Sequence, residues 1–366
     1  MQVANGQVQT LDALEQQLAK LEQQVQANPE TVLEQVGEQL AGWELLVRQH
    51  AAYSLGLRIG ELLFETKQLW LALSWFHWVV SSEVTEPDIA TRAKALRQKG
   101  RIYIFLGMSE TALPIFEEAE ELFRTSGAME TREYSVLLQN HAVALVRTRQ
   151  YEAALDVSKR ALPQLIAHGD LNSAARVSAT MGSCLRITNQ YEEALDSFIQ
   201  ARDWLETTQD YLHLGRVWHN YAELMRDWGR VEEAIAAWLM SLEMKKRTHD
   251  HTGQVNTLLS MAGYLMSQAE YHSAWKYVSQ AIALCHQYQL REAEIRCLDK
   301  WSEILIALSR YADLEVCATR AAHLANIGFG KDRVKAMIGK IAEHCRQVGL
   351  EQQAAQYNTI AVQIID

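Results

Sequence analysis

A motif that recurs every 40 residues constrains this chain more than any other feature. The motif reads aromatic-x-x-Ala-Leu-x-x-aromatic-x-x-Ala, and its clearest copy runs from Tyr191 to Ala201. Aligned copies, 40 or 42 residues apart, begin at Leu69, Ser109, Tyr151, Val231, Tyr271, Tyr311 and Glu351. A fixed period of roughly 20–50 residues is typical of a solenoid, whose units are stable only when stacked on their neighbours. The period therefore predicts a stack of similar units with a long surface for a partner.

Helix is the only secondary structure that the sequence supports. Apolar residues recur at i, i+3, i+4 and i+7, and no long stretch alternates β-branched with polar residues as strands do. In the Tyr191 unit we expect a first helix over 174–188 and a second helix from 191 to about 205. Small residues, including Gly60, Gly100 and Gly182, stand nine residues before motif starts. They predict close helix crossings, where a bulkier side chain would cost about 1–3 kcal/mol.

The unit resembles the tetratricopeptide repeat, which has small residues in its first helix and opens its second with an aromatic residue. Tyr103 and Gly107 stand at the aromatic and turn positions of that repeat, and Gly229 occupies the same turn position. Units of 40 residues are similar to those of bacterial quorum-sensing peptide receptors, the Rap and PlcR groups, and of kinesin light chains. The resemblance implies an all-α, right-handed superhelical solenoid of about eight helix hairpins over residues 50–366.

Residues 1–49 are predicted to form a separate N-terminal helical hairpin. A heptad stripe precedes a helix start at Asn28-Pro29, and consists of Leu11, Leu14, Leu18, Leu21 and Val25. Three roles stay open for this hairpin: it caps the first unit, it joins two copies in a homodimer, or it docks a partner. The Rap group docks a response regulator with its N-terminal helical bundle. Other peptide receptors carry a DNA-binding domain at this end, but this segment is short and poor in basic residues, so we expect no direct contact with nucleic acid.

Charge and composition indicate the cellular compartment in which we expect the protein. The net charge of −10 argues against general binding to nucleic acid or anionic membranes. No apolar run approaches the roughly 18 residues of a membrane span, and the polar first ten residues lack signal-peptide features. The five cysteines are odd in number and widely spaced, which favours reduced thiols over a disulfide framework. We therefore expect a cytoplasmic protein.

The resemblance implies that the first helix of each unit lines a concave face, and it supplies candidate peptide-binding residues. These are mostly basic, in a chain that is acidic overall: Arg97, Arg101, Asn140, Arg147, Arg176, Arg186, Arg216, Asn220, Arg226 and Asn256. Arginine binds carboxylates with two parallel hydrogen bonds, and an asparagine amide matches the donor and acceptor of one peptide unit. The expected ligand is a peptide or protein segment that is acidic or has a free carboxylate. The alternative is that these arginines pair with acidic residues of neighbouring units.

No other constellation predicts chemistry. His249-Asp250-His251 stands in a polar turn without a second pair of metal ligands, and Gly328–Lys331 lacks the full phosphate-loop pattern. We expect neither a metal, a cofactor nor catalysis. The favoured hypothesis is a cytoplasmic regulator that binds a short extended peptide. The alternatives are a scaffold for larger proteins without a peptide ligand, and a response-regulator phosphatase of the Rap kind.

Overall fold

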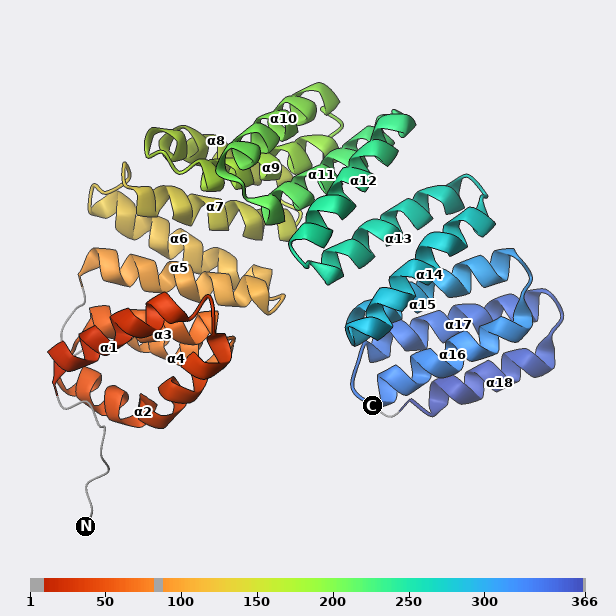
Figure 1. The fold of residues 1–366 in the computed structure, drawn as a ribbon, viewed down its shortest axis with the longest axis horizontal. Helices are drawn as coiled ribbons and strands as arrows, with labels where there is room; N and C mark the ends of the chain where they lie inside the picture. Colours follow the sequence, from red (N-terminus) through yellow and green to blue (C-terminus); the bar gives the residue numbers. More distant parts are fainter. Residues whose placement is uncertain (1–9, 82–87, 365–366) are drawn as a thin grey trace, which may run out of the picture. The chain divides into compact units, whose positions relative to one another are not determined.

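The computed structural model describes residues 10–81 and 88–364, in which every regular element is a helix. The chain divides into two compact units, residues 1–197 and 198–366. The first unit contains α1 (Leu11–Gln24), α2 (Pro29–Gln49), α3 (Tyr53–Glu65), α4 (Leu69–Ser81), α5 (Ile89–Phe105), α6 (Ser109–Thr125), α7 (Arg132–Arg147), α8 (Tyr151–Ala167), α9 (Leu171–Ile187) and the start of α10 (Tyr191–Thr208). Its helices pair in chain order, and each hairpin packs on the next (Figure 1).

The second unit repeats this arrangement. After the end of α10 it contains α11 (Tyr211–Asp227), α12 (Val231–Arg247), α13 (His251–Ser267), α14 (Tyr271–Gln287), α15 (Arg291–Ala307), α16 (Tyr311–Asn326), α17 (Lys331–Gln347) and α18 (Glu351–Val362). Within each unit, helices contact only partners one or two places away along the chain. The predicted all-α repeat fold is confirmed, and every second helix from α4 to α18 begins at the residue that opens its motif.

In the repeat hairpins, from α3–α4 to α17–α18, each internal turn has a left-handed residue two places before the second helix. This residue is Lys67, Gly107, Arg149, Asn189, Gly229, Ala269, Ser309 or Gly349. The left-handed conformation costs an L-residue roughly 1–2 kcal/mol, whereas glycine adopts it freely. Glycine is therefore favoured but not required, which explains why only some copies show the turn signal in the sequence.

Two glycines inside first helices let an aromatic ring of the second helix pack against the backbone. A Cβ atom added to Gly60 would lie 2.5 Å from the Phe76 ring, and one added to Gly100 would lie 2.5 Å from the Phe116 ring. Both rings are fully buried. Because the aromatic residue stands at the eighth position of the motif, these pairs explain why a small residue recurs nine places before the motif start.

The N-terminal hairpin shares its core with the first repeat. Leu14, Leu18 and Leu21 of the heptad stripe are buried, and they join one apolar cluster with residues of α2, α3 and α4. Both α1 and α2 contact α3. The stripe is thus used within the chain, so a dimer would have to form through other residues. The boundary at residue 49 remains a prediction.

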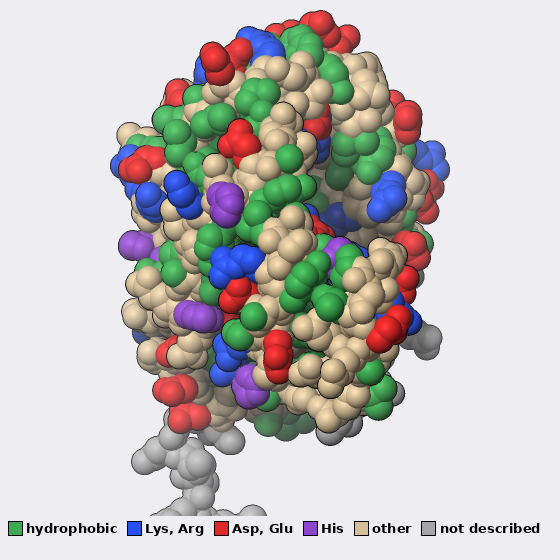
Figure 2. Space-filling view, turned by 90° about the vertical axis from the view of Figure 1, so that its right-hand side faces the viewer, with side chains coloured by type: hydrophobic (Ala, Val, Ile, Leu, Met, Phe, Trp, Pro, Cys, Tyr) green, Lys and Arg blue, Asp and Glu red, His purple; other side chains and the backbone are tan. Residues whose placement is uncertain are grey.

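The surface is mixed in character. On the face shown in Figure 2, acidic and basic side chains are interspersed with apolar ones, and neither sign of charge dominates. Among the helices of the described residues, none has both the length and the apolar character that crossing a bilayer requires.

Candidate functional site

The first helices of four successive hairpins in the first unit surround a cavity of about 610 Å³, here called the basic pocket. The helices are α3, α5, α7 and α9, and each contacts the next. The lining residues are Ser54, Leu57, Arg58, Glu61, Asp88, Ala90, Thr91, Lys94, Arg97, Arg132, Glu133, Val136, Ser173 and Arg176. The cavity thus lies on the helices that the repeat resemblance assigns to the concave face.

Three of the cations around the basic pocket are held by carboxylates. The shortest N–O distances are 2.8 Å for Arg58 with Glu22, 3.6 Å for Lys94 with Glu133 and 2.5 Å for Arg132 with Asp170. The Arg58 guanidinium also donates from Nη2 to Glu22 at 2.9 Å, which makes this pair bidentate. These three cations, none of them among the predicted candidates, are therefore engaged in ordinary ion pairs.

Arg97 differs from the other cations of the basic pocket. Within residues 10–81 and 88–364 its guanidinium has neither an ion pair nor a hydrogen bond, and its Nε is buried without a partner. Burial lowers the pKa of Arg97 to about 10, and the charge of Arg101 acts in the same direction. The side chain is still cationic at neutral pH. The charges of Glu61 and Glu133 oppose this shift without forming an ion pair with Arg97. A buried charge without a direct ion-pair partner is costly, so this position favours an incoming anion.

Arg101 and Asn140 extend this surface by one helical turn. Arg101 follows Arg97 on α5, donates to Gln98 Oε1 at 2.6 Å and lies over the Phe64 ring at 4.7 Å. Asn140 follows Val136 on the same face of α7, and its Nδ2 is buried with no partner among the described residues. A buried donor left unpaired costs about 1–3 kcal/mol, which a ligand acceptor would recover.

The other candidates of the first unit have different surroundings. Arg176 lines the basic pocket and donates to Ser173 Oγ at 2.9 Å. Arg186 is half-buried further along α9. Arg147 lies at the C-terminal end of α7, where Nη1 donates to the Ile104 carbonyl at 2.8 Å and the side chain lines a separate cavity beside the turn after α5. Arg97 and Arg176 are therefore the two candidates that the basic pocket brings together.

Sequence reasoning missed Arg58 and Arg132 in this pocket. Arg58 stands eleven residues before its motif start, which is the position that the candidate Asn140 occupies in its own unit. Arg132 lies one helical turn before Val136, outside the positions assigned to the groove. Extending the same offsets to the first unit would have found Arg58, whereas Arg132 had no such signal.

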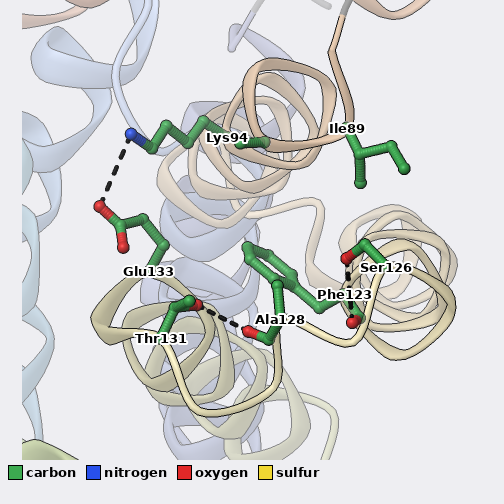
Figure 3. A pocket seen from close by; sticks show the side chains of 8 residues that line it. Ile89, Lys94, Phe123, Ser126, Ala128, Thr131 and Glu133 are labelled. Atoms are coloured by element: carbon green, nitrogen blue, oxygen red, sulfur yellow. Dashed lines mark hydrogen bonds and ion pairs between the residues drawn. The ribbon is translucent and has the colours of Figure 1, made fainter.

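An apolar pocket of about 410 Å³ adjoins the basic pocket. Its lining includes Ile89, Phe123 and Ala128, and the Lys94–Glu133 pair borders both cavities. In Figure 3 the Phe123 side chain lies in the centre, with Ile89 on one side and the ion pair on the other. Lys94 and Glu133 are both more than a third exposed, so their mutual attraction is weak and costs little to separate.

In the second unit the candidate residues are mostly paired. Arg226 binds both Glu223 and Asp227, which lie on its own helix α11 and not on a neighbouring unit. Asn256 Oδ1 accepts from Arg296 Nη1 at 2.7 Å. Arg216 and Asn220 lie on α11, the first exposed and the second half-buried. The second unit therefore offers only Arg216 as an exposed candidate cation, and the binding role of all ten candidates remains a prediction.

Potential metal ligands are scattered. Across the described parts of the chain, no three His, Cys, Asp or Glu side chains are grouped closely enough to hold a metal ion.

Comparison with known proteins agrees with the fold. The family model described as "SNAP: Soluble NSF attachment protein, SNAP" matches residues 72–246, less than half of the chain. No curated protein matches the sequence directly. The apo form of the quorum sensor NprR from B. thuringiensis is similar with a TM-score of 0.61 at 14% identity, over 97% of this chain and 99% of that chain.

Two further solved structures have the same architecture. A Rap protein complexed with Competence and Sporulation Factor has a TM-score of 0.59 at 13% identity, over 96% of this chain and 97% of that one. Aspartyl phosphate phosphatase F from Bacillus subtilis has a TM-score of 0.53 at 15% identity, over 91% and 74% respectively. At such low identity the likeness shows the fold alone. The chain is a helical repeat protein of the tetratricopeptide type.

Proposed function

We propose that the chain is a cytoplasmic regulator without catalysis of its own, which binds a short extended peptide in the basic pocket. The single observation that carries this proposal is Arg97, a mostly buried guanidinium without a partner among the described residues, in a cavity of about 610 Å³. A peptide carboxylate, from an acidic side chain or the C-terminus, would supply the missing counterion. A charge-assisted hydrogen bond of this kind contributes about 1.5–3 kcal/mol.

Two neighbouring features add detail to the ligand. The unpaired Nδ2 of Asn140 would donate to a main-chain carbonyl, as one peptide unit requires. The apolar pocket beside the Lys94–Glu133 pair would take an apolar side chain of the same peptide. The similar Rap structure contains Competence and Sporulation Factor, and NprR is described as a quorum sensor; both support an intracellular signalling peptide as the ligand class.

The test begins with a heptapeptide library that has free C-terminal carboxylates. Peptides retained by the full chain on size-exclusion chromatography are identified by mass spectrometry, labelled and titrated by fluorescence anisotropy. Arg97→Met removes the charge but keeps the volume, and we expect it to weaken binding at least tenfold, which corresponds to about 1.4 kcal/mol. Arg97 has no acidic partner to leave stranded, so this variant should fold as stably as the unaltered chain.

A matched control separates local from general electrostatics. Arg124 lies on α6, is well exposed and, among the described residues, pairs only with Glu121. Arg124→Met should leave the peptide affinity unchanged. Equal affinities for the unaltered chain and Arg97→Met would exclude this site.

Two other outcomes would identify a different function. If no peptide is retained but larger proteins bind and survive Arg97→Met, the chain is a scaffold. If it releases phosphate from a phosphorylated receiver domain, it is a response-regulator phosphatase, the activity named for the similar phosphatase F.

A further inference from the structure

Two buried cysteines of the second unit face each other across consecutive helices. Cys285 lies on α14 and Cys297 on α15, and their sulfur atoms are 3.9 Å apart. Both are almost completely buried and lie in one small apolar cluster. All five cysteines are free thiols, and the structure brings only these two within hydrogen-bond distance of each other among the residues it describes.

The two buried thiols differ in their position relative to a cavity. Cys285 lines a cavity of about 450 Å³ that it shares with His286, Glu294 and Arg320, whereas Cys297 does not. Beside this cavity, the Glu294 carboxylate accepts hydrogen bonds from Arg320 at 2.7 Å and from His286 at 2.9 Å. The carboxylate is thus neutralised by its own partners, and of the two cysteines only Cys285 borders this cavity.

We propose that Cys285 and Cys297 form a peroxide-sensitive dithiol that closes into a disulfide between α14 and α15. The Cys285 thiolate attacks one oxygen of hydrogen peroxide, so that an S–O bond forms, the O–O bond breaks and hydroxide leaves to become water. Cys297 then loses its proton and attacks the Cys285 sulfur, which forms the S–S bond and releases the second hydroxide as water. Two thiols are oxidised and one peroxide is reduced to two waters.

The surroundings of the pair assign these roles. The hydrogen bond between the two sulfur atoms lowers the pKa of Cys285, where it outweighs burial, and it raises the pKa of Cys297, where burial acts in the same direction. The thiolate is therefore favoured on the sulfur that lines the cavity, and the thiolate is the form that reacts with peroxide. To close the bond, the sulfur atoms must approach from 3.9 Å to about 2.05 Å.

The chain offers a direct readout. Trypsin cuts after Lys276, Arg291, Arg296 and Lys300, so the two cysteines fall on separate peptides, 277–291 and 297–300. After peroxide treatment of the full chain and alkylation under denaturing conditions, we expect these two peptides joined, with the loss of two hydrogens and release by dithiothreitol. Cys317 serves as an internal control: it is equally buried, and its thiol contacts the Leu298 carbonyl rather than another sulfur, so it should remain alkylatable.

A second variant tests the order of events. In Cys297→Ser the second step is blocked, and dimedone should label Cys285 as a sulfenic acid. Cys317→Ser should leave the disulfide unchanged. The proposal is wrong if peptides 277–291 and 297–300 stay separate and fully alkylated at a peroxide dose that oxidises free glutathione completely. It is also wrong if Cys317 oxidises before Cys285. If the Cys297→Ser variant does not fold, peptide mapping of the unaltered chain tests the proposal by itself.

Discussion

The Nζ of Lys245 on α12 donates a hydrogen bond to Thr257 Oγ1 on α13 at 2.8 Å. The lysine side chain is only 3% exposed, and it packs beside Gly215, where a Cβ atom would approach its Cγ to 3.1 Å. No carboxylate of the described residues lies within ion-pair distance of it. Burial lowers the pKa of Lys245 to about 8, so the folded chain holds this ammonium at a cost.

That cost predicts the effect of pH on stability. The pKa of about 8 lies below the value of 10.5 in an unfolded chain, so the folded state binds fewer protons between these two values. The free energy of unfolding should rise with pH across this window, by about 3 kcal/mol at most. Lys245→Met should gain this stability already at pH 7 and lose the advantage near pH 10.5. Urea unfolding at both pH values measures the change, and exposed Lys246→Met should show no such difference.

The glycine and phenylalanine pairs predict where volume is not tolerated. Gly60→Ala and Gly100→Ala should each destabilise the chain by about 1–3 kcal/mol, because the new methyl group overlaps a buried ring. Gly37→Ala is the matched control, since it lies in the α2 helix with nothing within 4 Å of its Cβ position. There alanine should stabilise by up to about 1 kcal/mol. Thermal unfolding measures the Tm of the three variants. Equal changes in Tm for all three would contradict the packing explanation.

The left-handed turn residue predicts a reciprocal pair of substitutions. Gly229→Ala places a side chain at φ 81°, and should destabilise by about 1 kcal/mol. Ala269→Gly relieves the same strain at φ 59°. The net stabilisation should be about a few tenths to 1 kcal/mol, because the added glycine also raises the conformational entropy of the unfolded chain. Chemical denaturation would measure both, and opposite signs are the required result.

A partly buried carboxylate in the first unit predicts a loss of stability in acid. Glu120 accepts from His141 Nδ1 at 2.6 Å and from Arg160 at 2.9 Å. Burial alone would raise the pKa of Glu120, but these two hydrogen bonds outweigh it and lower the pKa below its usual range. The stabilisation is therefore present above about pH 4.5 and is lost as the pH falls through the folded value.

Glu120→Gln removes that stabilisation. At pH 7 we expect a loss of about 1–3 kcal/mol, because a neutral amide replaces the charged acceptor of the hydrogen bonds from His141 and Arg160. The difference from the unaltered chain should shrink as the pH falls toward 3. Glu117→Gln, at an exposed position on the same helix, should be neutral throughout. A constant deficit at every pH would show that packing, not charge, explains the loss.

The starts of the second helices could be predicted from the sequence because each unit repeats the same motif. The residue that opens each motif, from Leu69 to Glu351, begins a helix in the structure. The helices that line the basic pocket were likewise predictable, since Arg97 and Arg176 both lie on first helices of their hairpins. Which arginines form ion pairs could not be predicted, because a partner can lie far away in the sequence. Glu22 of the N-terminal hairpin, for example, pairs with Arg58.

The cysteine pair shows the same limit. Cys285 and Cys297 appeared unrelated in a list of widely spaced thiols, yet the turn between α14 and α15 folds them together. Their proximity depends on which faces of two adjacent helices meet. The motif assigns residues to a helix face only to within about one position. An error of one position would place a cysteine on a face that does not contact the neighbouring helix.

Contacts between helices at most two places apart have a consequence for how such a chain folds and lengthens. No late, long-range closure is needed within either unit, so any hairpin can form first and its neighbours can add to it. Pulled from its ends, the chain should lengthen in successive steps of about one hairpin rather than in a single event. Inserting or deleting one 40-residue unit should likewise leave the remaining hairpins folded.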